Sequence, residues 1–194
     1  MPADIALPTI DGKTRSFGDL RGKVVFVHFW SITCPWEKYA EPVIVELEKA
    51  YKGKPVVVLA INSNQNEIGP APKPANDEES GKEQDNKDED EQDGDAGEKK
   101  QKPSQYAKLI AHVKKTEGFD HEALVDHGNT VSTLFGARTT PHCFVIDAKG
   151  VLRYAGALDG YAQDKKNPEA YVKNAIDALL AGKDVETTTT RPYG

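Results

Sequence analysis

Long apolar runs mark the centre of a sheet in this 194-residue chain. Residues 24–30 and 55–62 consist almost entirely of β-branched, aliphatic and aromatic side chains, the pattern of strands that are covered on both faces. Shorter runs predict three more strands, over residues 123–126, 142–147 and 151–155. A tight turn joins the last two, which predicts a hairpin.

Between these runs, apolar residues recur at helical spacing. The spacing predicts helices over residues 35–51, 105–115, 129–135 and 168–180. Pro42 lies inside the first of them and predicts a bend, because proline removes one helical hydrogen bond. Strands that alternate with helices favour an α/β fold, with a central mixed sheet flanked by helices.

Residues 65–104 depart from this pattern, because they contain almost no aliphatic or aromatic side chains. Between residues 76 and 103 there are 12 acidic side chains against five basic ones. Such a composition cannot bury enough surface to offset its ordering entropy, so we expect a long acidic disordered insert, more as a solubilising loop than as a partner-binding segment. The predicted domain covers residues 1–186, interrupted by this insert, and residues 187–194 are predicted to be a flexible tail.

Charge and hydropathy exclude several classes of function. The insert carries a net −7 against −6 for the whole chain, which leaves +1 elsewhere and indicates no nucleic-acid partner. No apolar run approaches the roughly 18–20 residues that a membrane span needs. The first residues lack the pattern of a signal peptide, so the chain as written is expected to be soluble and cytoplasmic. It would be extracytoplasmic if it is a mature form or an excised domain, and two cysteines leave the redox compartment open.

The strongest chemical candidate is Cys34, which follows the apolar run 24–30 and stands beside Pro35 where a helix should begin. Unpaired N–H groups and the positive end of the helix dipole favour the thiolate form there. An inert buried cysteine is the alternative.

Several motifs carry a resemblance to a known family: Phe29-Trp30-x-x-x-Cys34-Pro35, the strand Val56–Asn62, Thr139-Thr140-Pro141, and Phe144-Val145-Ile146-Asp147-Ala148-Lys149-Gly150. With these motifs the chain resembles the redoxin branch of the thioredoxin superfamily, which includes the AhpC/TSA and TlpA-like proteins. The resemblance extends from about residue 7 to residue 180. It implies a thioredoxin-like fold, no cofactor, and a cis peptide bond before Pro141. It further implies that Trp36, Thr140 and Pro141 contact the substrate.

One departure from the family changes the expected chemistry. Thiol–disulfide oxidoreductases of this fold use C-x-x-C, whereas the second cysteine is replaced by Glu37 here. Exchange within the motif is therefore excluded. Glu37 either stabilises the helix N-terminus or relays the proton of Cys34. Cys143 lies on an apolar strand and is either a core residue or a resolving thiol facing Cys34.

The histidines are secondary candidates. His142 adjoins the predicted loop, and its side chain either assists proton transfer or points outward from the strand. His28 lies inside a predicted strand and is expected to be a core or edge residue. The remaining histidines have no metal-ligand spacing with the cysteines, so no metal is predicted.

Three functions remain open. The first is a thiol oxidoreductase in which Cys34 attacks a disulfide or a peroxide and is regenerated by an external thiol such as glutathione, or by Cys143. The second is a single-cysteine peroxidase, in which Arg138 would replace the arginine of related peroxidases. The third is a binding module that keeps the scaffold without turnover.

Overall fold

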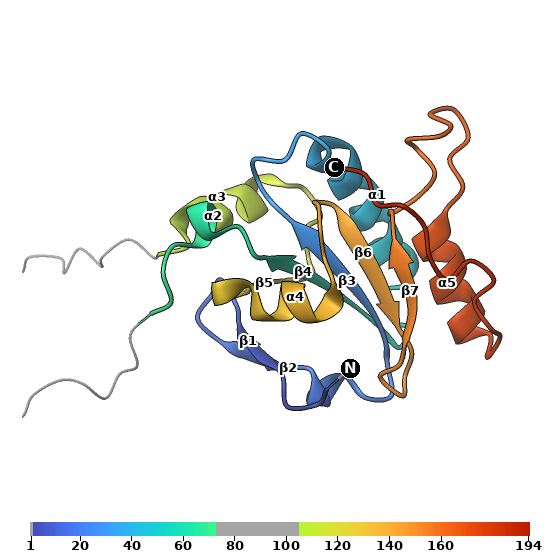
Figure 1. The fold of residues 1–194 in the computed structure, drawn as a ribbon, viewed down its shortest axis with the longest axis horizontal. Coiled ribbons are helices and arrows are strands. Elements are labelled where there is room, and N and C mark those ends of the chain that lie inside the picture. Colours follow the sequence, from blue (N-terminus) through green and yellow to red (C-terminus); the bar gives the residue numbers. More distant parts are fainter. Residues whose placement is uncertain (1, 73–104) are drawn as a thin grey trace, which may run out of the picture.

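The computed structural model describes residues 2–72 and 105–194 (Figure 1). The strands are β1 Ala6–Pro8, β2 Thr14–Ser16, β3 Val24–Trp30, β4 Val56–Asn62, β5 Glu122–Val125, β6 His142–Ile146 and β7 Leu152–Gly156. The α-helices are α1 Glu37–Ala50, α2 Gln65–Ile68, α3 Ala107–Lys115, α4 Thr130–Phe135 and α5 Tyr171–Leu180, with two short 3₁₀ turns at Gly18–Leu20 and His127–Asn129.

Five strands form one mixed sheet in the order β5-β4-β3-β6-β7. The β3–β4 and β4–β5 pairs are parallel, whereas β6 and β7 run antiparallel to their neighbours. All seven residues of β3 are buried because this strand lies in the middle of the sheet. The predicted α/β architecture is confirmed, and the strand predicted over residues 24–30 matches β3.

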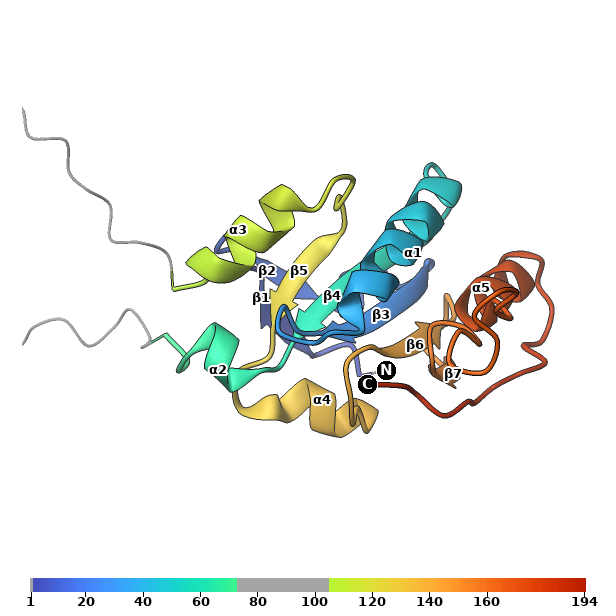
Figure 2. The same ribbon diagram turned by 90° about the horizontal axis from the view of Figure 1, so that it is seen from above.

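Helices cover both faces of the sheet (Figure 2). α1 and α3 lie on one face and α4 lies on the other. α5 shares an apolar core with α1, in which Ile44 and Ile176 are fully buried. The β1–β2 hairpin, which the sequence pattern did not predict, adds Leu7 to a second core with Phe29 and Val131.

The helix after β3 begins at Glu37, two residues later than predicted. The preceding residues form turns instead, in which Cys34 N–H donates to Ser31 O at 3.1 Å and Glu37 N–H donates to Cys34 O at 3.2 Å. Cys34 therefore lies in the turn that leads into α1 and not in its first helical turn. The helix, 14 residues long, continues through Pro42.

The predicted start of the insert, at residue 65, is too early. Residues 65–68 form the short helix α2, whose N-terminus is capped by the side chain of Asn64. Ile68 is fully buried against α3, and Glu67 is buried as well. One apolar side chain and one buried carboxylate therefore hold this segment in the fold. Residues 73–104, the rest of the predicted insert, lie outside the described residues.

The predicted flexible tail, residues 187–194, is packed against the domain. Thr189 forms a parallel bridge with Ala155 of β7, and Tyr193 is only 7% exposed. The boundary predicted at residue 186 is therefore wrong, because backbone pairing and one aromatic ring attach the segment to the core.

Candidate active site around Cys34

The thiol of Cys34 lies at the carboxyl end of β3, immediately before α1. The residue is half-buried, and its Sγ donates a hydrogen bond to Thr140 O at 2.8 Å. The unpaired N–H groups of the first turn of α1 are close by in the sequence, and such groups favour negative charge. A thiol that is reachable and near a helix start has the surroundings of a nucleophile.

Thr140 and Pro141 come to this thiol from the loop before β6. Their peptide bond is cis, as the family resemblance implied. β6 pairs with β3 so that His142 is opposite Phe29, which brings the loop beside the turn that holds Cys34. Pro141 is buried and Thr140 is half-buried. The structure thus places three of the predicted site residues, Cys34, Thr140 and Pro141, next to one another.

Trp36 is half-buried at the start of α1. Its ring centroid lies 5.1 Å from that of Tyr193, at a tilted angle. The predicted substrate contact therefore has one neighbour that sequence reasoning missed. Tyr193 follows a run of threonines, and neither pattern nor spacing indicates that it would reach the site.

Glu37 turns its side chain away from solvent and into the core. It is 3% exposed, and its Oε2 lies 3.1 Å from Nε2 of His28, which is 2% exposed. Within the described residues, Glu37 Oε1 and His28 Nδ1 have no hydrogen-bond partner. The site therefore has a buried carboxylate–imidazole pair beneath the first turn of α1, with a free polar atom on each member. His28 is a core residue, as one reading of the sequence had it.

Cys143 lies directly opposite His28 in the β3–β6 ladder and is fully buried. Burial raises the pKa of its thiol well above the usual value, and the nearby carboxylates of Glu37 and Asp159 raise it further. Both cysteines are free thiols. The surroundings of Cys143 keep its thiol protonated, which makes it a poor nucleophile.

A buried carboxylate that sequence reasoning missed holds the loop before Cys34. Glu67 of α2 accepts hydrogen bonds from the N–H groups of Ile32 and Thr33, both at 3.1 Å. Four side-chain groups also donate to it: Ser31 Oγ, Thr33 Oγ1, Asn62 Nδ2 and Asn64 Nδ2, at 2.6, 2.7, 2.6 and 3.1 Å. The network could have been predicted from Asn62 and Asn64, the polar residues at the carboxyl end of β4.

The charge on Glu67 is stabilised by these donors. Burial alone would raise the pKa of its carboxyl group, but the hydrogen bonds from Ser31, Asn62 and Thr33 outweigh burial and lower the pKa below the usual 4.5. The carboxylate is thus ionised at neutral pH. The loop from Ser31 to Thr33, and with it the position of Cys34, depends on that charge.

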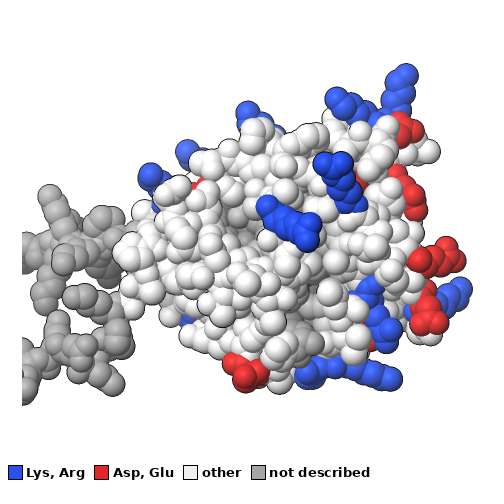
Figure 3. Space-filling model, viewed as in Figure 1, with Lys and Arg blue, Asp and Glu red and all other residues white. Residues whose placement is uncertain are grey.

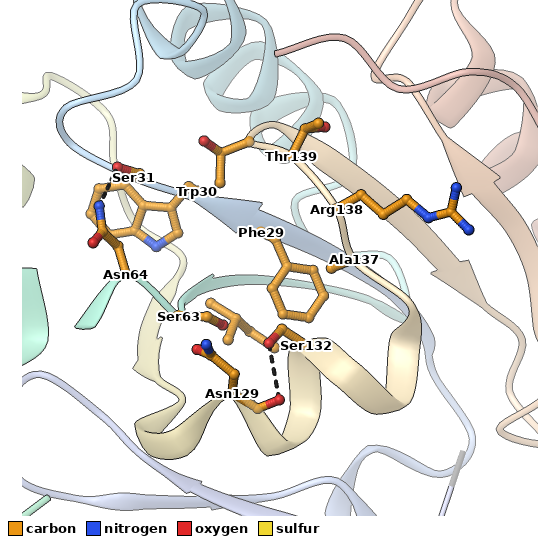
Figure 4. A pocket seen from close by; sticks show the side chains of 12 residues that line it. Phe29, Trp30, Ser31, Ser63, Asn64, Asn129, Ser132, Ala137, Arg138 and Thr139 are labelled. Carbon is orange, nitrogen blue, oxygen red and sulfur yellow. Dashed lines mark hydrogen bonds between the residues drawn. The ribbon is translucent and has the colours of Figure 1, made fainter. Parts of the chain in front are cut away.

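A cleft of about 300 Å³ lies between α4 and the loop before β6 (Figure 4). Its walls are mostly polar, and they include Ser31, Asn64, Asn129, Ser132, Arg138, Thr139 and Thr140. Figure 4 shows the guanidinium of Arg138 turned away from Phe29 and Ser132, so its charge lies outside the cleft. The space-filling view shows basic side chains near the middle of this face and acidic side chains mainly toward its edge (Figure 3).

His142 does not alternate outward, since it is only 6% exposed and packs against Phe144. Burial lowers the pKa of its ring to about 4, and the charge of Arg138 contributes to the shift. The N–H of Arg138 donates to His142 Nδ1 at 3.2 Å, which requires an unprotonated Nδ1. At neutral pH this ring is uncharged.

The folded protein should lose stability on acidification because of His142. Its folded-state pKa of about 4 lies below the unfolded value of 6.5, so the stabilisation is complete above pH 6.5 and is lost as pH falls toward 4. We expect about 2 kcal/mol of this loss between pH 7 and pH 5. Urea unfolding at both pH values should show a correspondingly smaller loss in His142→Asn. Equal losses in the two proteins would contradict the assignment.

Within residues 2–72 and 105–194, no three His, Cys, Asp or Glu side chains are grouped as metal ligands. Among the helices of the same described residues, none is long and apolar enough to cross a membrane.

The fold and the arrangement of Cys34 beside Thr140–Pro141 define a thioredoxin-like protein of the redoxin branch. Solved structures support the thioredoxin-like fold. A hypothetical protein from Sinorhizobium meliloti is 25% identical and superposes with a TM-score of 0.72, over 99% of this chain and 88% of the other. An exposed lipoprotein thioredoxin from Streptococcus pneumoniae is 23% identical, with a TM-score of 0.54 over 93% and 99% of the two chains.

Residues 1–155 match the model of the AhpC/TSA family, and the chain belongs to that family. Among curated proteins it is similar to the thiol-disulfide oxidoreductase ResA of Bacillus cereus, with 40% identity over 60 residues, or 30% of this chain and 34% of the relative. The ResA of Halalkalibacterium halodurans is 31% identical over 65 residues, or 34% and 37% of the two chains. The similarity thus spans about a third of the length of these relatives.

Proposed function

We propose that this protein is a thiol oxidoreductase in which Cys34 is the only nucleophile. The observation that carries the proposal is the half-buried thiol of Cys34, placed before α1 with its Sγ 2.8 Å from Thr140 O. Membership of the AhpC/TSA family and the similarity to proteins named thiol-disulfide oxidoreductase support it.

Cys34 takes part in two exchanges because the motif has one cysteine, and a third exchange follows without it. The Cys34 thiolate attacks one sulfur of a disulfide, forms a mixed disulfide, and releases the other sulfur as a thiolate that takes up a proton. An external thiol such as glutathione then attacks the substrate sulfur of the mixed disulfide, which frees Cys34 and leaves the substrate joined to the external thiol. A second molecule of the external thiol attacks the external sulfur of that disulfide and releases the second substrate thiol. The substrate disulfide is thus reduced to two thiols, and two external thiols are oxidised to one disulfide.

Residues around Cys34 take distinct roles in this proposal. Thr140 and Pro141 form the backbone wall against which the substrate sulfur lies, and Trp36 supplies an apolar contact to a substrate large enough to extend beyond that wall. Glu37 acts through its buried pair with His28 as an acceptor for the proton that leaves Cys34. The N–H of Glu37 donates to Cys34 O at 3.2 Å, so the two residues belong to the same turn.

The burial of Cys143 favours the external thiol over an internal resolving thiol. A thiol that is fully buried and has a raised pKa supplies little thiolate at neutral pH. We therefore assign Cys143 to the core.

Peroxide is the second candidate substrate, because a free thiolate also attacks O–O bonds to give a sulfenic acid and an alcohol or water. Such a reaction gains from positive charge at the developing oxyanion. Figure 4 shows the guanidinium of Arg138 turned away from Phe29 and Ser132, and this orientation favours disulfides over peroxides.

The test is the rate of Cys34 alkylation in the Cys143→Ala protein, with hydrogen peroxide and 2-hydroxyethyl disulfide as competing reagents. We expect Cys34 to react with the disulfide at least about tenfold faster than free cysteine does at the same pH. We also expect the disulfide to protect Cys34 from alkylation more rapidly than peroxide. Faster protection by peroxide would make the protein a single-cysteine peroxidase. A thiol that reacts with both reagents no faster than free cysteine would make it a binding module.

A further inference from the structure

The segment of residues 187–194, called here the C-terminal segment, crosses β7 and ends beside the start of α1 (Figure 1). Ala155 N–H donates to Thr188 O at 3.0 Å, and Thr190 N–H donates to Ala155 O at 3.2 Å. The segment therefore extends the sheet by backbone pairing.

Thr190 fixes the segment where it leaves β7. Its Oγ1 accepts a hydrogen bond from Ala157 N–H at 2.9 Å and lies 2.6 Å from the hydroxyl of Tyr154. The backbone at Gly156 comes so close that an added Cβ would lie 2.2 Å from Thr190 Oγ1. Only glycine at position 156 allows this approach.

Tyr193 attaches the far end of the segment to the active site. Its ring packs on Trp36, and its hydroxyl donates to Asp159 Oδ1 at 3.0 Å. Asp159 is 4% exposed and also accepts hydrogen bonds from the hydroxyl of Tyr39 and the N–H of Tyr161. Burial and the charge of Asp159 raise the pKa of Tyr193 far above the usual value, so its hydroxyl remains a donor.

Gly194 reaches the backbone that a polypeptide substrate would use. A Cβ added at Gly194 would lie 2.2 Å from Thr140 O, the same oxygen that accepts the hydrogen bond from Cys34. An extended peptide gains affinity by pairing its main chain with such an exposed edge. Here the thiol of Cys34 already bonds to the carbonyl of Thr140, and Gly194 lies close to the same oxygen.

We propose that the C-terminal segment restricts Cys34 to small disulfides and excludes extended polypeptide substrates, with Tyr193 as the specificity-determining residue. This inference rests on the proposed function. The segment packs on Trp36 and comes close to Thr140 O, the oxygen that also accepts the hydrogen bond from Cys34. A small disulfide has to reach only the half-buried thiol of Cys34 and undergoes the exchange described above. A polypeptide needs the covered edge and has to displace Tyr193 first.

The test compares the full chain with its Tyr193→Ala variant, using 2-hydroxyethyl disulfide and a disulfide-linked peptide of about twelve residues. Loss of Tyr193 should raise the rate with the peptide at least about tenfold, the factor that corresponds to about 1.4 kcal/mol. The rate with the small disulfide should change less than about twofold, since specificity is a difference between two affinities. Tyr193→Phe is the matched control, because it keeps the ring on Trp36 and loses only the bond to Asp159. Its peptide rate should lie between those of the other two proteins.

The inference would be overturned if Tyr193→Ala changed the rates with both substrates equally. It would also be overturned if the wild-type protein reacted as fast with the peptide as with the small disulfide. Either result would leave the proposed function intact. A thiol inert toward the small disulfide would overturn the proposed function itself. For that case, alkylation of Cys34 in a Cys143→Ala background by iodoacetamide and by a maleimide-bearing peptide still tests the size restriction. Only the reaction of the maleimide peptide should accelerate in Tyr193→Ala.

Discussion

Replacing Cys34 by serine should lower turnover of disulfide substrates by at least about a thousandfold, the scale of losing an essential nucleophile. A serine hydroxyl is far less acidic than a thiol and forms no disulfide, so neither exchange step can occur. Turnover is measured as oxidation of glutathione with 2-hydroxyethyl disulfide. A Cys34→Ser protein that kept most of its activity would rule out this residue as the nucleophile.

Cys143→Ala is the matched control for that experiment, since it removes the other thiol of the chain. It should keep turnover within about threefold and lower the free energy of unfolding by about 1 kcal/mol, because one small buried side chain is truncated. Alanine is preferred to serine here, since a hydroxyl at this fully buried position would need its own partner. If Cys143→Ala were as inactive as Cys34→Ser, Cys143 would be a resolving thiol after all.

Glu67→Ala should be the most damaging change outside Cys34. It removes the acceptor of six hydrogen bonds, two of them from backbone N–H groups, and leaves those donors beneath the loop before Cys34. We expect the free energy of unfolding to fall by about 3 kcal/mol, with a matching loss of turnover. Glu67→Gln keeps one oxygen but turns a donor toward the other donors, so its effect should be about half as large.

Two readouts separate the Glu67 network from a general loss of stability. Glu46→Ala is the control, because Glu46 forms an exposed ion pair with Lys49 and its loss should change stability by less than about 0.5 kcal/mol. The second readout is pH. The pKa of Glu67 is lowered in the folded state, so its stabilisation is complete above pH 4.5 and is lost as pH falls through the folded-state value. An alanine variant as stable as Glu46→Ala would disprove the role of the network.

The sequence alone is sufficient to predict an element or a site residue where one local pattern determines it. The apolar run 24–30 predicts β3, since only a central strand is apolar at every position. Cys34 follows from its place after that strand, and its contact with Thr140 follows from the family resemblance. The start of α1 was predicted two residues early because the turn bonds of Cys34 and Glu37 compete with helix formation there.

The missed features all depend on partners that are distant in the sequence. Glu67 lies in a polar stretch, and its burial requires the loop at Ser31 to come within reach. Tyr193 is buried only because Trp36 and Asp159 meet it in space. The inward orientation of Glu37 likewise requires His28 from a different element. Periodicity within one segment carries no information about such pairs.

Gln105 joins the two sides of the chain that flank residues 73–104, because its Nε2 donates to Ile68 O at 2.7 Å. The packed ends of this region are thus held together by contacts that do not involve the residues between them. A protein engineer who splices a tag or a reporter domain into residues 73–104 therefore leaves the hydrogen bond between Gln105 and Ile68 in place.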